Sequence, residues 1–380
     1  MSKAEYKRLG DYIREVNVRN RELKVTKLVG LTIDKAFIPS VANVIGTDLS
    51  NYKVIRKEQF ACSLMQVSRD GKMPIAMFEE DEAIMSPAYP MFEVIDKTVL
   101  LPQYLMMWFS RSEFDREASY YAVGGVRGSL TWEGFCNMRL PVPSIARQRE
   151  IVSEYETLTN RIRLNEQMIQ HFEATAQALY RKTFVDNIDK ENLPEGWRMG
   201  TIGEFCKEMK SGGTPNRSHN EYWDKKDFPW LKSGEVHNNV IISVEEYISQ
   251  SGLDNSSAKI IPQGSVIMAM YGATAAQVAY LDCDTTTNQA CCNMICNSKE
   301  DAAYLFFHLL ANQDDIKKLA NGGAQENLSQ ELIAQQSVVI ISDNKVKSLF
   351  VPILDNLIVR YKEAELITEL QSLLLAKMGQ

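Results

Sequence analysis

One stretch of the sequence reads Gly124-Gly125-Val126-Arg127-Gly128-Ser129-Leu130-Thr131, and a second of the same type, Gly322-Gly323-Ala324-Gln325-Glu326-Asn327-Leu328-Ser329, follows about 200 residues later. Outward from it, Tyr104-Leu105-Met106-Met107 returns as Tyr304-Leu305-Phe306-Phe307. Nearer the start, Leu9-Gly10-Asp11-Tyr12-Ile13 returns in type as Ile202-Gly203-Glu204-Phe205-Cys206. The order is preserved and the offset barely changes, which unrelated short matches would not do. The sequence therefore predicts a duplicated unit of about half the chain.

Each copy ends in a long helical pattern. Apolar residues recur at steps of three and four from Ile151 to Leu179, and again from Val346 to Met378. Patterns held for about four heptads favour a coiled coil over two amphipathic helices that each lie on their own domain. Asn165 interrupts the first stripe as a register-setting polar residue, and Pro352 either begins the second helix or kinks it. A helix from about Ala146 to Phe184 would be about 58 Å long, which suits a spacer.

The region ahead of each helix mixes short strands and turns. Strand candidates such as Lys24–Leu31 and Ser265–Met270 alternate with Gly, Pro and Asn turns. The predicted fold class is α+β, with two duplicated mixed α/β domains separated by two long helices that form an antiparallel coiled coil. The predicted boundaries are residues 1–143 for the first domain, 144–185 for the first spacer helix, 186–342 for the second domain and 343–380 for the second spacer helix.

Composition limits the functional classes. The 380 residues are enough for two domains with cores of their own. A formal charge of -7 argues against attraction of the whole molecule to nucleic acid, so DNA binding would need local basic surfaces. The seven cysteines fit no disulfide pattern, and no long apolar run or signal-peptide core is present. We expect a cytoplasmic protein with free thiols.

The second half carries a series of short motifs. In order, they are Ser211-Gly212-Gly213-Thr214-Pro215, Glu221-Tyr222-Trp223, Phe228-Pro229-Trp230-Leu231-Lys232-Ser233-Gly234-Glu235, Ala258-Lys259-Ile260-Ile261-Pro262, Met270-Tyr271-Gly272-Ala273-Thr274, Thr287-Asn288-Gln289-Ala290 and Gly323-Ala324-Gln325-Glu326-Asn327-Leu328. Together and in this order, these motifs resemble those of the specificity subunit of type I restriction-modification systems. The first half matches more loosely, through Tyr52-Lys53-Val54-Ile55, Ser86-Pro87-Ala88-Tyr89 and the segment at Gly124, and has no Thr-Pro or Tyr-Trp counterpart. The resemblance covers essentially the whole chain.

The resemblance implies two target-recognition domains that each read one half of a split site in double-stranded DNA. It also implies that the two antiparallel helices set the spacing and dock two modification (methyltransferase) subunits and, in systems that have them, restriction (translocase-nuclease) subunits. The chain would have no membrane partner, no catalysis alone and no cofactor of its own. S-adenosylmethionine, ATP and Mg would be bound by partner subunits. Two alternatives stay open: the specificity subunit of a type II system with a separate catalytic chain, and a coiled-coil assembly protein without DNA activity.

Candidate DNA contacts concentrate in the polar loop, residues 207–232, which combines basic, hydroxyl and aromatic side chains between glycines. Base readout needs amide or forked side chains, and phosphate contacts need Lys, Arg and hydroxyl donors. The candidates in the second domain are Lys210, Thr214, Arg217, Lys225, Lys226, Lys232 and Tyr271. Those in the first domain are Arg69, Lys72 and Arg127. Tyr222, Trp223 and Trp230 fit packing anchors better than stacking platforms, because the bases of a duplex are already stacked.

Catalytic motifs are absent from the sequence. An amino-methyltransferase needs an Asn- or Asp-Pro-Pro-aromatic segment, but no Asn-Pro or Asp-Pro dipeptide occurs. The sequence has no G-x-x-x-x-G-K motif, so no nucleotide-binding loop of the Walker type is predicted. It also has no Pro-Asp dipeptide, with which the motif of a metal-dependent nuclease begins. Cys283, Cys291, Cys292 and Cys296 do not have zinc spacing and are better explained by strand burial. The four histidines are scattered, and none lies beside a plausible nucleophile.

Overall fold

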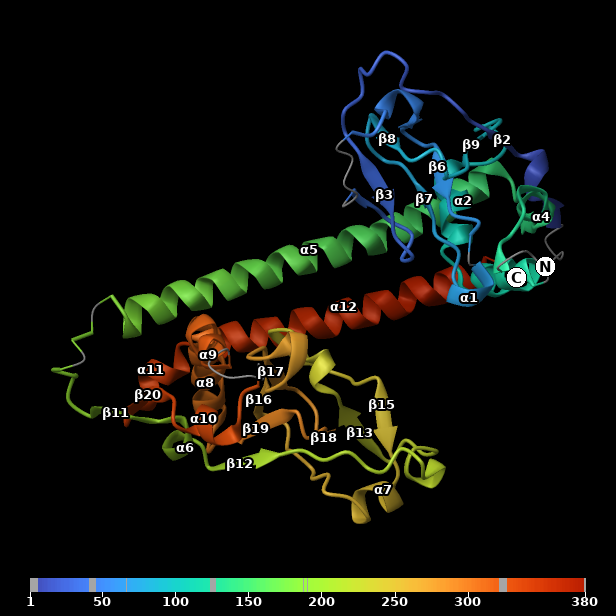
Figure 1. Ribbon diagram of the computed structural model, residues 1–380. Coiled ribbons are helices and arrows are strands. Elements are labelled where there is room, and N and C mark those ends of the chain that lie inside the picture. The colour runs from blue at the N-terminus through green and yellow to red at the C-terminus, as the bar shows by residue number, and fades with distance from the viewer. Residues whose placement is uncertain are drawn as a thin grey trace. The chain divides into compact units, whose positions relative to one another are not determined.

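The computed structural model describes residues 6–40, 46–65, 67–123, 128–186, 188–189, 191–320 and 327–378. The chain divides into a first unit, Met1–Ile162 with Ile367–Gln380, and a second unit, Arg163–Leu366 (Figure 1). The two long helices each pass from one unit into the other, so every unit contains a stretch of both. Each unit is described below by itself.

The first unit is built around a four-stranded antiparallel sheet. Its strand order is β2 (Ile13–Glu15), β9 (Met91–Val94), β6 (Phe60–Cys62) and β7 (Ile75–Met77). Three antiparallel pairs complete its strands: β1 (Tyr6–Arg8) with β10 (Arg139–Pro141), β3 (Val29–Leu31) with β4 (Phe37–Pro39), and β5 (Lys53–Arg56) with β8 (Glu82–Met85). Its shorter helices are η1 (Leu9–Asp11), η2 (Leu49–Asn51), α1 (Val67–Asp70), α2 (Pro102–Phe109), α3 (Ser112–Ala122) and α4 (Trp132–Asn137).

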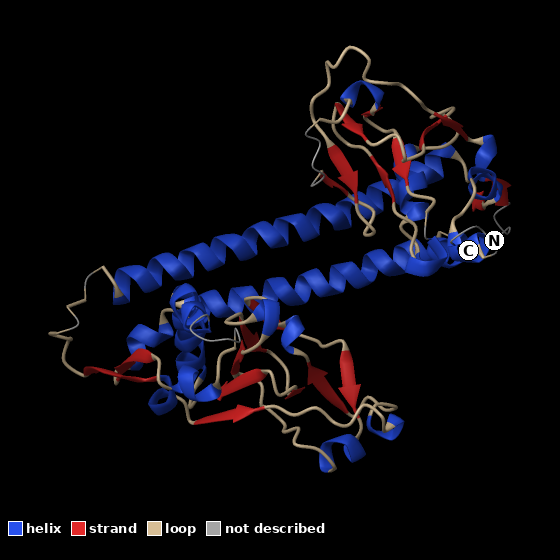
Figure 2. Cartoon of the chain, in the orientation of Figure 1, coloured by secondary structure: helices blue, strands red, loops and turns tan. Residues whose placement is uncertain are grey.

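The second unit has a larger sheet, which is antiparallel except for one parallel pair at its edge (Figure 2). Its strand order is β12 (Glu208–Ser211), β19 (Cys291–Ile295), β16 (Val266–Ala269), β17 (Val278–Leu281) and β14 (Asn239–Ile241). A second sheet has the order β15 (Glu246–Ile248), β13 (Phe228–Leu231) and β18 (Thr286–Thr287), and β11 (Trp197–Thr201) pairs with β20 (Ser337–Ile341). Its shorter helices are α6 (Ile202–Phe205), η4 (Asn220–Tyr222), η5 (Ser233–Glu235), α7 (Gln250–Asp254), η6 (Gly272–Thr274), α8 (Lys299–Ala311), α9 (Gln313–Ala320), α10 (Gln330–Ala334) and α11 (Asn344–Ser348).

The duplication that the sequence predicts is confirmed by the topology. The order β2-β9-β6-β7 in the first unit matches β12-β19-β16-β17 in the second, and every neighbouring pair in both is antiparallel. Tyr104 and Tyr304, which the repeat aligns, are both buried. The Tyr104 hydroxyl donates to the Pro141 carbonyl at 3.2 Å, and the Tyr304 hydroxyl donates to the Val339 carbonyl at 2.9 Å. The same tyrosine therefore ties a helix to the closing strand in each copy.

Two long helices, α5 (Ile145–Phe184) and α12 (Val351–Lys377), pack antiparallel and join the two mixed domains, which confirms the predicted fold class. In the second unit Arg360 of α12 donates to the buried Asn165 of α5 at 3.2 Å, so the polar residue that interrupts the first stripe has a partner on the other helix. Pro352 lies in the first turn of α12 and begins the helix, where its missing N–H costs nothing.

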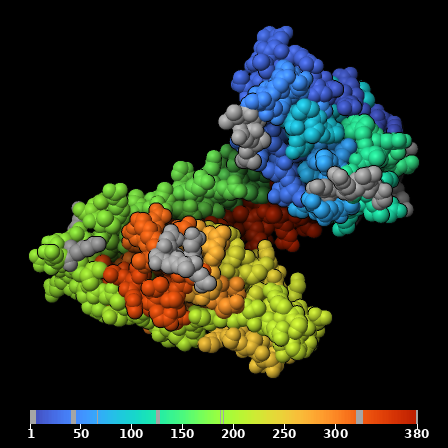
Figure 3. Space-filling model, in the orientation of Figure 1, coloured from blue at the N-terminus to red at the C-terminus, as the bar shows by residue number. Residues whose placement is uncertain are grey.

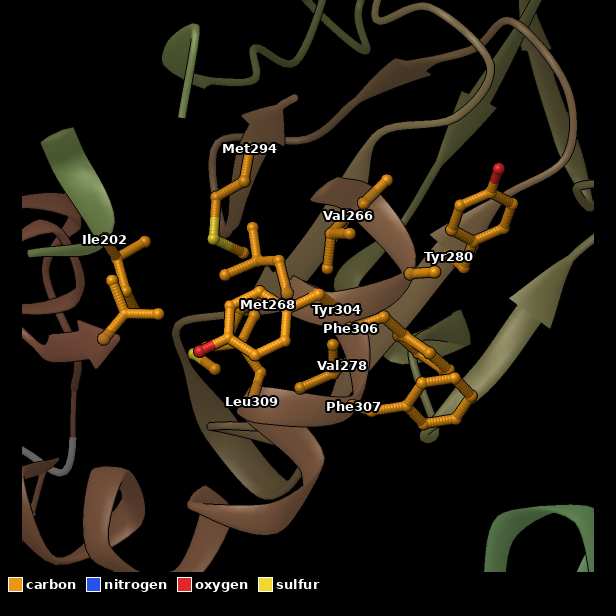
Figure 4. Packing of buried hydrophobic residues seen from close by; sticks show 14 of the residues in the cluster. Ile202, Val266, Met268, Val278, Tyr280, Met294, Tyr304, Phe306, Phe307 and Leu309 are labelled. Atoms are coloured by element: carbon orange, nitrogen blue, oxygen red, sulfur yellow. The ribbon is translucent and has the colours of Figure 1, made fainter. Parts of the chain in front are cut away.

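Each unit buries its own core, and the long helices contribute to both. In the second unit, aromatic residues of α8 pack against the sheet. Ala176 and Tyr180 of α5 belong to the same cluster, as do Leu354 of α12 and Phe350, which directly precedes α12. Figure 4 shows Tyr304, Phe306 and Phe307 of α8 among the strand residues Val266, Met268, Val278 and Met294. In the first unit, Ile151 and Val152 of α5 join the cluster around the β6 and β9 strands. Burial of these faces explains why the helices stay attached to their domains.

Candidate nucleic-acid interface

The first motif of the second unit is fixed by close backbone approach. A Cβ on Gly212 would meet the carbonyl oxygens of Thr287 and Asn288 at 2.2 Å, and one on Gly213 would meet the Ser257 carbonyl carbon at 2.4 Å. The Gly213 amide donates to the Thr287 carbonyl at 2.8 Å. Only glycine fits at both positions, so this motif seats the start of the polar loop against the strand connection that follows β18.

Five segments that are far apart in the sequence meet at this place, and we call them the convergent face. They are Thr214, Lys232–Glu235, Tyr271–Thr274, Asn288–Gln289 and Asn327–Gln330. The Asn288 amide donates to the Leu231 carbonyl at 2.9 Å, the Thr274 hydroxyl donates to the Ser233 carbonyl at 3.0 Å, and the Leu328 amide donates to the Met270 carbonyl at 2.9 Å. Thr214 is hydrogen-bonded to Gln289. Most of the quoted motifs therefore build one polar surface.

Arg217 is clamped within the polar loop, which lies at the surface in yellow-green in Figure 3. Its guanidinium carbon lies 3.6 Å from the ring centroid of Trp223 and 4.8 Å from that of Trp230. Its Nη1 donates to the Glu246 carboxylate at 2.6 Å. The Trp230 indole N–H donates to the Gly213 carbonyl at 2.9 Å. Both tryptophans thus hold the loop in place, and Arg217 would have to leave Glu246 to reach a base.

Two more of the candidate cations are paired with acids. The Lys232 ammonium lies 2.6 Å from Glu245 and 3.1 Å from Glu246, and these hydrogen bonds raise the pKa of Lys232. The bond from Arg217, followed by that from Lys232, holds the pKa of the Glu246 carboxyl below its usual value. Lys210 lies 2.8 Å from Glu208 on the same strand. The positive charge of this part of the loop is therefore largely compensated.

Lys225 and Lys226 differ from these cations. Both are exposed, and neither forms an ion pair with any residue that the structure describes. The Lys226 ammonium lies 5.2 Å from the ring centroid of Tyr247, a contact that leaves its charge accessible. Of the loop's candidate cations, these two are the best suited to phosphate.

Two of the three candidates of the first unit, Arg69 and Lys72, lie at the connection between β6 and β7. Arg69 on α1 binds Asp70 at 2.7 Å, and Lys72 binds Asp34 at 3.2 Å. Arg127 lies outside the described residues. Most of the basic residues near the start of the unit also have polar partners: Arg8 with Asp11, Arg14 with Glu93, Arg19 and Arg21 with Asn51, Lys24 with Glu22, and Lys27 with Glu80.

Sequence reasoning did not single out Gln289, Asn288, Ser233 or Thr274 as site residues. Gln289 is exposed beside Thr214, and an amide can read two atoms of one base. Each of these residues stands inside a quoted motif, so the motifs pointed to them. Their meeting on one face depends on strand pairing between segments tens of residues apart, which the sequence does not specify.

The described cysteines and histidines form no metal site, and Cys291 and His308 are buried. Within the described residues no group of three or more His, Cys, Asp or Glu side chains could hold a metal ion. Burial raises the pKa of the Cys291 thiol to about 12, which keeps it protonated and unreactive. His308 is buried against Tyr180. Among the described helices, none has the length and apolar character to cross a bilayer.

Comparison with known proteins gives a consistent result. A family model described as the type I restriction modification DNA specificity domain matches residues 194–371. The chain is 22% identical to the type I restriction enzyme HindI specificity subunit of Haemophilus influenzae, over 78% of this chain and 81% of that protein. It is 23% identical to the EcoR124I/EcoR124II specificity subunit of Escherichia coli, over 75% of this chain and 72% of that protein. In fold it resembles the crystal structure of the type I S subunit from M. genitalium, with a TM-score of 0.60, 12% identity and coverage of 100% and 97% of the two chains.

Proposed function

We propose that the chain is the specificity subunit of a type I restriction-modification complex, the non-catalytic, DNA-binding part of such a complex, and that each of its two recognition domains reads one half of a bipartite DNA site. The observation that carries this proposal is the sheet β2-β9-β6-β7, repeated as β12-β19-β16-β17. Two copies of one scaffold with different loops suit a target made of two different halves. The separate cores of the units further support independent reading.

The long helices are proposed to set the distance between the two half-sites and to dock the modification subunits. Forty residues of α5 correspond to about 60 Å of helix, and the buried Asn165–Arg360 layer fixes its register against α12. A helix pair with one fixed register gives one fixed spacing. The proposed boundaries remain residues 1–143 and 186–342 for the recognition domains, with spacer helices at 144–185 and 343–380.

The proposed partners are double-stranded DNA, two modification subunits and, where the system has them, restriction subunits. The family has no catalytic site of its own, so S-adenosylmethionine, ATP and Mg are assigned to those partners. Because the target is chromosomal DNA, the proposed compartment is the cytoplasm. The proposed contacts in the second domain are Lys225 and Lys226 to phosphate, together with Lys210, Thr214, Arg217, Lys232 and Tyr271, and those in the first domain are Arg69, Lys72 and Arg127.

Exchange of one recognition domain tests bipartite reading. Residues 190–341, which include both strands of the β11–β20 pair, are replaced with those of a related subunit. The expected methylated site keeps one half and acquires the other half from the donor. The measurement is sequencing of methylated bases in a host that carries the hybrid chain and its modification subunit.

The reciprocal hybrid, which exchanges the first recognition domain, is the matched control and should change the opposite half. If both halves change together in either hybrid, the domains do not read independently. If the assembled wild-type complex places no methyl groups at a split site, the proposed function is wrong, and a coiled-coil assembly role would replace it.

A further inference from the structure

The repeat makes two strand connections equivalent. In the first unit, residues 63–74 connect β6 to β7, and in the second unit, residues 270–277 connect β16 to β17. The Leu130 amide donates to the Leu64 carbonyl at 2.8 Å, and its repeat counterpart Leu328 donates to the Met270 carbonyl at 2.9 Å. The same backbone bond therefore anchors each connection to the residues that follow the glycine segment.

Both connections present a large apolar side chain to solvent directly after this anchor. Met65 follows Leu64 and is 59% exposed, and Tyr271 follows Met270 and is 39% exposed. A single exposed apolar residue is ordinary. Here the same position is occupied in both copies, although the two connections differ in length and in most other residues.

Each connection also leaves its backbone open to an approaching molecule. Gly71 has φ +66° and Gly272 has φ +73°, and nothing lies within 4 Å of a Cβ built at either position. In contrast to Gly212 and Gly213, no neighbour in the fold requires these two to be glycine on grounds of space. A left-handed turn with free space above it lets a phosphodiester backbone or a base edge come close.

The charge beside each connection fits DNA. Arg69 and Lys72 lie on the first connection, and their acidic partners, Asp70 and Asp34, are on the protein surface, where ion pairs are weak and exchangeable. On the second connection, Thr274 binds the Ser233 carbonyl directly after Lys232, so the connection belongs to the convergent face. Both connections therefore combine an apolar tip with nearby cations and hydroxyls.

We propose that these two connections are equivalent DNA-reading loops, in which Met65 contacts base edges of one half-site and Tyr271 contacts base edges of the other. This inference rests on the proposed bipartite function. Apolar side chains discriminate bases by contact with the thymine methyl group, and the tyrosine hydroxyl can add a hydrogen bond. Met65 thereby becomes a specificity-determining residue of the first unit, where motif matching gave the weakest guidance.

The test uses the complex assembled from the chain and its modification subunits. The wild-type site is first determined by sequencing of methylated bases, and the domain hybrids assign each half to a unit. Met65→Ala should relax base preference roughly tenfold at one or two positions of the first unit's half only, and Tyr271→Ala should do so in the second unit's half only. Matched controls are Ile95→Ala and Ile260→Ala, which truncate side chains that are 50% and 47% exposed on other segments.

The unaffected half is an internal control, since loss of the whole fold would abolish preference in both halves. Met65→Gln, which retains side-chain length, and Tyr271→Gln, which retains a polar end on a shorter side chain, replace any alanine variant whose melting curve shows that its unit no longer folds. Folded variants that keep full preference at every position, or that relax no more than the controls, overturn the inference. A wild-type complex without a split site would instead contradict the proposed function itself.

Discussion

Arg217 illustrates how a residue's surroundings change the interpretation of its sequence. In the sequence it is a planar fork in a polar loop, which suits guanine. In the structure its charge is stacked on Trp223 and bound to Glu246, so it also stabilises the loop. Sequence reasoning singled out residues 207–232 because basic, hydroxyl and aromatic side chains are dense there. It could not tell the clamped cation from the accessible ones, because the acid that compensates Arg217, Glu246, lies on β15, 29 residues further along the chain.

Substitutions in the polar loop should separate these roles. Lys225→Ala or Lys226→Ala should weaken binding to cognate and scrambled duplexes alike and lower the salt slope by about one. Arg217→Ala should lose about 1–3 kcal/mol on the cognate half-site only, and should also lower the melting temperature because the cation–π contact is lost. Titrations of the assembled complex at several salt concentrations measure both effects. Lys317→Ala on α9 is the control, and equal affinity of all variants would mean that the loop does not face DNA.

His308 should make the stability of the second unit depend on pH. Burial lowers the pKa of His308 to about 4, while in the unfolded chain it returns to about 6.5. Between pH 4 and pH 6.5 only the unfolded chain binds a proton at this histidine. The contribution of His308 to the free energy of unfolding is therefore complete above pH 6.5 and falls by about 1.4 kcal/mol per pH unit as the pH decreases towards 4. Urea unfolding of the wild type and His308→Gln between pH 4.5 and 7 measures it. The variant should show the flatter profile, and parallel profiles would contradict this prediction.

At the scale of elements, periodicity predicted the helices well and propensity predicted strands less well. The observed α5 begins at Ile145, one residue from the predicted start, because its stripe of buried positions runs without a break. The strand expected over Lys24–Leu31 shortens to β3, Val29–Leu31. The Asn20 side chain donates to the Val25 carbonyl at 2.8 Å and accepts from the Val25 amide at 3.3 Å. The Asn20 side chain therefore occupies the amide and the carbonyl of Val25, which a neighbouring strand would otherwise have bonded.

The paired helices should act as a ruler that has to be lengthened on both sides. Gln371 donates to Thr159 at 2.7 Å and Arg360 donates to Asn165 at 3.2 Å, so the two cross-helix bonds flank Ile162. A heptad inserted only after Ile162 lengthens α5 but not α12, so the two cross-helix hydrogen bonds can no longer form together. This variant should lose DNA binding. A second heptad after Leu366 restores both and should lengthen the spacer of the recognised site by about three base pairs, since seven residues add about 10 Å. Methylated-base sequencing measures the spacer, and an unchanged spacer would refute the ruler.

At the scale of the whole molecule, the repeat was predictable because its buried tyrosines and glycine segments keep their order. The convergent face could not be predicted from the sequence, because Thr214, Ser233 and Gln289 meet only after β13 pairs with β18.

We predict that the isolated chain transfers no methyl group to DNA, whereas the complex with modification subunits methylates adenine at a specific site. Transfer of labelled methyl groups from S-adenosylmethionine measures this. Methylation by the homogeneous chain alone would contradict it.

The first and last strands of each recognition domain lie side by side, β1 against β10 and β11 against β20. A domain of this kind enters and leaves its scaffold at one place. A genetic recombination event with crossovers in those two strands therefore transfers the sheet of the domain and leaves both long helices, which supply part of its core, unaltered. New target sequences can then be inherited in blocks, by shuffling existing domains, without the many single substitutions that would each have to preserve the core.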